Sequence, residues 1–93
     1  MGYNREYSQR RTLRNAAIRD AAKARPCADC KGRFDPVCMD FDHHDGKKFD
    51  IGSMNTHAEE TLLAEIAKCD VVCANCHRLR TQRRRHESAR RVA

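Results

Sequence analysis

The feature that most constrains the fold of this chain is a pair of short cysteine motifs, in each of which two residues separate two cysteines. Cys27 and Cys30 form the first motif, and Cys73 and Cys76 form the second. Four thiolates at this spacing can close a tetrahedron around one zinc ion. Because 42 residues lie between Cys30 and Cys73, a shared ion would join the start of the domain to its end and add to folding stability. The alternative is four buried cysteines without a metal.

A bound metal also fits the size and composition of the chain. The 93 residues suffice for one small domain, in which a hydrophobic core alone gives marginal stability. The six cysteines could instead form disulfides, but residues 1–25 contain no apolar targeting segment. We therefore expect a cytoplasmic protein with thiolate–metal chemistry and no membrane association. Cys38 and Cys69 each stand alone among apolar residues and are predicted to pack in the core.

The charge of the chain is unevenly distributed. Residues 1–25 contain seven basic and two acidic residues, residues 26–77 five basic and ten acidic ones, and residues 78–93 seven basic and one acidic. The two ends are therefore suited to a polyanion, whereas the acidic middle is suited to bind cations. The alternative is that the arginines only keep a small protein soluble. The runs at 83–85 and 90–91 favour a nucleic-acid partner, because their charges repel one another without one.

The pattern of residues predicts a small α+β fold. A basic helix is expected from Arg5 to Lys23, with Leu13 and three alanines on a weak apolar stripe and Pro26 ending it. A strand from Val37 to Phe41 and a returning strand from Lys47 to Ile51 are predicted next. They are followed by a helix over residues 57–68, which begins with a capping box of Thr56 and Glu59 and has His57 exposed in its first turn. An extended stretch over 70–72 and a helix from Ala74 toward Ser88 complete the predicted elements. The predicted organisation is a basic N-terminal helix at 1–26, a core at 27–87 and a basic C-terminal tail at 88–93.

One acidic residue and two histidines are the candidates for catalysis. Asp42 and His43 follow the first predicted strand, and His77 directly follows the second cysteine motif. Phosphodiester hydrolysis needs a general base to activate water and a cation to neutralise charge on the phosphoryl oxygens and the leaving group. A carboxylate, an imidazole and several waters suit Mg²⁺, Mn²⁺ or Ni²⁺. These residues therefore indicate a site for cutting nucleic acid.

Asp42-His43 after an apolar strand, followed by Cys73-Ala74-Asn75-Cys76-His77-Arg78 at the start of a helix, resembles the HNH endonucleases. The likeness covers about residues 27–85, and it is strongest to small phage-type members in which paired cysteine knuckles hold zinc beside the active site. It implies a ββα-metal (His-Me finger) core that hydrolyses DNA and nicks one strand at a time. It implies His43 as the general base, Asp42 and His77 as ligands of a catalytic divalent metal, and a structural zinc on the four cysteines.

Two positions depart from the pattern of this family. Its central Asn is expected shortly before the second cysteine motif, where this chain has the segment 68–70 without an Asn. Asn75 and Asn55 are the two open alternatives for that role. The second departure is a pair of adjacent histidines. Alternation along the strand places His44 on the opposite face from His43, so His43 is preferred as the base and His44 is a candidate accessory contact to substrate or metal.

Basic residues around these candidates are predicted to bind DNA phosphates. They are Arg78, Arg80, Arg83 and Arg84 on the last helix, and Lys47 and Lys48 on the loop after the base. Phosphate contacts give salt-sensitive binding without base readout, and no segment resembles a recognition helix. Specificity would then come from a phage or host protein partner or from a second subunit, and both a monomer and a homodimer fit the sequence. A non-catalytic zinc module that binds nucleic acid is the alternative function, and a redox protein is a third.

Overall fold

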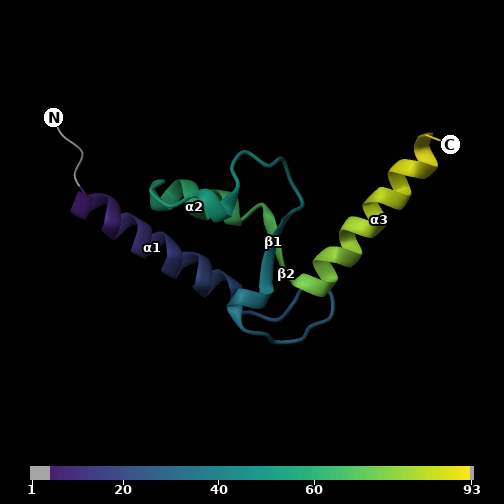
Figure 1. The fold of residues 1–93 in the computed structure, drawn as a ribbon, viewed down its shortest axis with the longest axis horizontal. Coiled ribbons are helices and arrows are strands. Elements are labelled where there is room, and N and C mark those ends of the chain that lie inside the picture. Colours follow the sequence, from purple (N-terminus) through teal and green to yellow (C-terminus); the bar gives the residue numbers. More distant parts are fainter. Residues whose placement is uncertain (1–4, 93) are drawn as a thin grey trace.

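The computed structural model describes residues 5–92 and gives them a small α+β fold with three α-helices and one antiparallel sheet of two strands (Figure 1). The elements are α1 (Arg5–Lys23), η1 (Pro36–Cys38), β1 (Met39–His43), η2 (Ile51–Ser53), α2 (Glu59–Ile66), β2 (Cys69–Cys73) and α3 (Ala74–Val92), where η denotes a short 3₁₀ helix. Residues 1–4 of the predicted N-terminal segment and residue 93 of the predicted tail lie outside the described part. The predicted α+β class is confirmed, as is the helix from Arg5 to Lys23.

The sheet pairs two strands that lie far apart in the sequence. Met39 of β1 stands opposite Cys73 of β2, and His43 stands opposite Cys69. The predicted returning strand from Lys47 to Ile51 is wrong, because this stretch is a loop that leads into η2. The extended stretch before the second cysteine motif occupies the partner position instead. Antiparallel pairing between segments so far apart brings the start of β1 beside the residues that enter α3, and the end of β1 beside the start of β2.

Two small groups of buried residues flank the sheet and stabilise the fold. One consists of Cys27, Met39, Val71, Val72, Cys73 and Cys76, and the other consists of Ile51, Met54 and Leu62 with Phe41 and Cys69 among the half-buried residues packed on it. The prediction that Cys38 packs in the core is wrong, since its side chain is exposed in η1 just before β1. Cys69 is half-buried. Three of the six residues in the first group are cysteines, so its stability depends on what the thiols bind.

Helix α1 docks through polar side chains rather than through the predicted apolar stripe. Asn15 is fully buried, and its amide nitrogen donates to the main-chain carbonyls of Met54, Asn55 and His57 at 3.0–3.1 Å. Leu13 is 73% exposed, so its predicted packing role is wrong. The loop before α2 presents carbonyl groups that need donors, and a buried amide supplies them where an apolar side chain would not.

Helix α2 begins at Glu59 with Ala58 as the N-cap residue, and no side chain caps it. The predicted capping box is therefore wrong. Thr56 lies before the cap, where its carbonyl accepts a hydrogen bond from Arg11 at 2.9 Å. The prediction that His57 is exposed is also wrong: it is half-buried, and its ring lies 4.9 Å from the ring of Phe49.

The molecule is elongated because α1 and α3 lie on opposite sides of the sheet and extend away from it, like the arms of a wide V (Figure 1). It extends 57 × 32 × 17 Å with a radius of gyration of 15.9 Å, whereas a compact domain of this length would have a radius of about 12 Å. Beyond Thr81, residues 82–91 of α3 are exposed. Among the described residues, no helix is both long and apolar enough to cross a membrane. The arginine-rich half of α3 is thus available to a partner.

Candidate functional site

The four cysteines of the two motifs come together at the point where β2 meets α3. Their sulfur atoms all lie within 4.8 Å of one another, and the Sγ atoms of Cys30 and Cys73 are 4.0 Å apart. A tetrahedral zinc with bonds of about 2.3 Å places its sulfur ligands about 3.8 Å apart. The first knuckle is a tight turn in which Lys31 has a φ of 64° and its N–H donates to the carbonyl of Cys27. The cluster could therefore hold a metal such as zinc, as the motif spacing predicts.

The thiols of this cluster differ in acidity. Burial raises the pKa of Cys27, but N–H groups of Cys30, Cys73 and Asp29 donate to it and outweigh burial, so its pKa falls to about 6. Hydrogen bonding with Cys73 and burial raise the pKa of Cys76 to about 12. The first thiolate therefore forms readily, and its charge opposes ionisation of the next. A divalent cation removes this repulsion and allows all four thiolates to form.

His77 lies on the first turn of α3, between two carboxylates of β1. Its Nδ1 is 3.0 Å from Oδ2 of Asp40, and its Nε2 is 3.7 Å from Oδ1 of Asp42. Residues two apart on a strand face the same side of the sheet, which is why both carboxylates reach the same ring. When Nδ1–H donates to Asp40, the lone pair of Nε2 is directed toward Asp42. Adjacent ligands of an octahedral cation at about 2.1 Å lie about 3.0 Å apart, so these two atoms would bind one cation after a small approach.

Asp40 is a site residue that sequence reasoning missed, although its alternation with Asp42 was the available signal. A histidine that binds a metal usually donates its other ring N–H to a carboxylate, which fixes the ring and its tautomer. Asp40 has this relation to His77. Asp42, by contrast, faces the remaining nitrogen.

Asp42 is 5% exposed and is bound by two arginines of α3. Arg84 donates to both of its oxygens at 2.9 and 2.7 Å, and Arg80 donates to Oδ2 at 2.8 Å. The hydrogen bonds from Arg84 and then those from Arg80 outweigh burial and lower the pKa of Asp42 to about 2. Arg80 also binds Asp29 and Asp70, whereas Arg84 is 53% exposed at its side chain. Of the two arginines, Arg84 has the greater freedom to turn outward.

His43, at the end of β1, is held by a carboxylate from α2. Its Nε2 lies 2.8 Å from Oε2 of Glu65, which is 2% exposed. Burial alone would raise the pKa of Glu65. The N–H of Lys48 and the ammonium of Lys68 donate to its carboxylate, with further hydrogen bonds from the Phe49 N–H and His43, and its pKa falls to about 2. Glu65 is therefore an ionised, buried hydrogen-bond acceptor beside the predicted base.

The two histidines open into one cavity of about 310 Å³. Its wall combines residues from α1, β1, the following loop and α3: Lys23, Asp40, Phe41, His43, Lys47, Asp50, Ile51, Gly52 and His77. A second cavity of about 440 Å³ lies on the other side of the Asp40–His77 pair and includes Arg78 and Arg85 in its wall. His77 lines both cavities and thus lies between basic residues from opposite ends of the chain. Lys23 and Arg85 were not predicted for the site.

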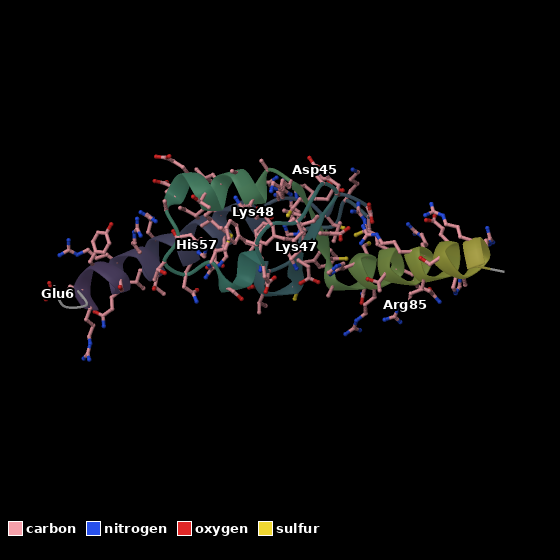
Figure 2. All side chains as sticks on the ribbon, turned by 90° about the horizontal axis from the view of Figure 1, so that it is seen from above. Glu6, Asp45, Lys47, Lys48, His57 and Arg85 are labelled. Carbon is pink, nitrogen blue, oxygen red and sulfur yellow. The ribbon has the colours of Figure 1, made fainter. Side chains whose placement is uncertain are left out.

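The remaining predicted residues lie around these cavities. Figure 2 shows Lys47 and Lys48 over the central part of the molecule, and Arg85 projecting outward from α3. Lys48 and Arg83 are exposed, and His44 is exposed beyond the end of β1. Asn75 is exposed on the first turn of α3 and lines a groove with Cys38. The structure thus brings His43 and His77 to one cavity with Asp42 beside His77, and it leaves Asn75 and His44 at the surface.

No protein-family model, no curated protein and no solved structure matches this chain.

Proposed function

We propose that this protein is an HNH endonuclease with a ββα-metal core that hydrolyses DNA phosphodiester bonds and nicks one strand. The observation that carries the proposal is that two histidines line one cavity and that each has one ring nitrogen bound to a carboxylate. In each ring the other nitrogen remains for chemistry. β1, β2 and the start of α3 would be the two strands and the helix of the core.

In the proposed mechanism, Nδ1 of His43 takes a proton from water, which attacks phosphorus in line with the departing 3′-oxygen. Asp42 and His77 would hold Mg²⁺ or Mn²⁺, with Ni²⁺ as a further candidate. The cation would neutralise charge on the phosphoryl oxygens and on the leaving group. The product would carry a 5′-phosphate, as the resemblance to HNH enzymes implies. Asp40 holds the ring of His77 so that Nε2 faces Asp42.

The zinc proposed for the four cysteines has a structural role in this account. Cys73 ends β2, and Cys76 lies next to His77 on the first turn of α3. A metal at this point fixes the direction in which α3 leaves the sheet, and therefore the position of His77 relative to β1. The structural metal and the catalytic metal would then have separate ligands.

DNA phosphates would be bound by the basic residues on both sides of the histidines. Lys23 and Lys47 lie in one cavity, and Arg78 and Arg85 lie in the other. Arg84 would leave Asp42 for a phosphate when the cation binds, since a guanidinium and a divalent cation repel one another at the same carboxylate. Binding through such contacts weakens steeply as the salt concentration rises.

The test of this proposal is nicking of supercoiled plasmid by folded, zinc-loaded protein, with added Mg²⁺ or Mn²⁺ and without either ion. The proposal expects open circles only with an added ion. Omitting the ion is preferable to adding EDTA, because EDTA would also remove zinc from the cysteines. DNA binding without cutting under every ion would favour the non-catalytic zinc module instead.

A further prediction concerns Asp40. Asp40→Ala is expected to weaken Mn²⁺ binding about 10- to 100-fold, because an unheld ring no longer presents Nε2 toward Asp42. Mn²⁺ titration followed by electron paramagnetic resonance measures this without any need for cutting. Asp45→Ala, which removes an exposed carboxylate after β1, is the matched control and should bind as the wild type does. Equal Mn²⁺ affinities in Asp40→Ala and the wild type would show that Asp40 does not position His77 for metal binding.

A further inference from the structure

We propose that Glu65 is the positioning residue that fixes the orientation and the tautomer of His43, an inference that rests on the proposed nuclease function. It would thereby take the role for which the family pattern expects an Asn. Glu65 comes from α2, a segment for which the sequence predicts a helix but no role in the site.

The contacts of Glu65 join three parts of the chain at one buried carboxylate. Its Oε2 lies 2.8 Å from Nε2 of His43 and accepts the main-chain N–H of Lys48 at 3.0 Å. Its Oε1 accepts from the ammonium of Lys68 at 3.1 Å. At 2% exposure, Glu65 makes these bonds inside the protein, out of reach of DNA. Its effect on a reaction in the cavity would therefore act through His43.

The chemistry of the partner determines which nitrogen of His43 is free. An ionised carboxylate only accepts hydrogen bonds, so the neutral imidazole must carry its proton on Nε2 to bind Glu65. Nδ1 then has the lone pair that a general base needs. With the opposite tautomer, Nδ1 would carry a proton and could not accept one from water. The pairing therefore selects the productive form of the ring before substrate arrives.

The same carboxylate also holds the loop that follows β1. Lys47 precedes the anchored residue Lys48 and lines the cavity that contains His43. Glu65 thus sets the position of the base relative to a cation that could contact the phosphate. The two residues that were candidates for the family's central Asn lie elsewhere. The Oδ1 atom of Asn55 accepts a hydrogen bond from Arg19, and Asn75 is exposed on α3.

Glu65→Gln is the variant that tests this role, because the amide keeps the size of the side chain and one acceptor oxygen. It removes the charge and allows an NH₂ group to face the ring, so the orientation of His43 is no longer unique. We expect kcat for plasmid nicking to fall about 10- to 100-fold with KM unchanged, since Glu65 does not face DNA. Glu60→Gln, an exposed change on the same helix, is the matched control and should keep both constants. Unchanged kcat in folded, zinc-loaded Glu65→Gln would overturn the proposal.

Nitrogen-15 NMR of the wild-type histidine rings separates failure of this inference from failure of the nuclease function. The neutral ring of His43 is expected to be protonated at Nε2 and bare at Nδ1, and this spectrum requires no cutting. Protonation at Nδ1 would overturn the role of Glu65 even if the wild type cuts DNA. If the ring is protonated at Nε2 but the folded protein does not cut DNA with any added metal ion, the pairing is correct and the nuclease function is wrong. Because the spectrum is recorded on the wild type, it tests the role of Glu65 even if Glu65→Gln does not fold.

Discussion

Cys73→Ser is expected to yield a chain that contains no stoichiometric zinc and does not unfold cooperatively. Cys73 is buried at the junction of β2 and α3, and its Sγ accepts the N–H of Cys76 at 3.4 Å. Without a metal, the buried group around it keeps only Met39, Val71 and Val72 as non-cysteine apolar members. Each such side chain contributes about 1.5–3 kcal/mol when fully buried, whereas a structural zinc site contributes about 10–16 kcal/mol of apparent binding free energy. Zinc analysis and thermal unfolding by circular dichroism measure the effect.

Cys38→Ser is the matched control for this change. It replaces the same thiol by the same hydroxyl, but Cys38 is exposed and lies outside the four-cysteine cluster. It should retain one zinc per chain and the melting temperature of the wild type. A Cys73→Ser protein with one zinc and an unchanged melting curve would show that the cluster does not stabilise the domain.

His43→Ala is expected to lower the rate of plasmid nicking by a factor of about 10²–10⁴, the usual contribution of a general base. His43 lines the cavity together with His77, and Nδ1 is the ring nitrogen that is not bound to Glu65. DNA affinity should be retained, because Lys47 and the arginines of α3 are untouched. Single-turnover nicking and a gel-shift titration measure the two effects separately.

His44→Ala provides the comparison for His43→Ala. The two residues are adjacent, but His44 is exposed after the end of β1, and its main-chain N–H bonds the carbonyl of Lys68. Its replacement should change the nicking rate little. An equal loss of rate in both variants, or a larger loss in His44→Ala, would contradict the assignment of His43 as the general base.

Features with a local signature could be predicted from the sequence. The cysteine spacing predicted the cluster of Cys27, Cys30, Cys73 and Cys76, and the structure brings their sulfur atoms together. The extent of α1 and the start of α3 follow from periodicity and from punctuating residues such as Pro26. The helix boundaries depend on neighbours in the chain, and each cysteine motif is recognised by its own short spacing, although the two motifs lie far apart in the sequence.

Features that depend on docking of distant segments could not be predicted in the same way. The strand partner of β1 was expected in the returning strand from Lys47 to Ile51, but β2 takes this position because its valines are buried there. The docking of α1 through Asn15 depends on carbonyls exposed by a loop about 40 residues away. The partner of His43 comes from α2, so no spacing rule around Asp42-His43 indicates Glu65.

The measurement that tests the central claim most directly is the chemistry of the DNA ends. Supercoiled plasmid is incubated with zinc-loaded protein and Mn²⁺, the protein is removed, and DNA ligase is added without a kinase. The account predicts open circles that ligase reseals, because in-line attack by water with loss of the 3′-oxygen leaves a 5′-phosphate beside a 3′-hydroxyl. Plasmid that stays supercoiled, or open circles that ligase cannot reseal, would contradict the proposed function.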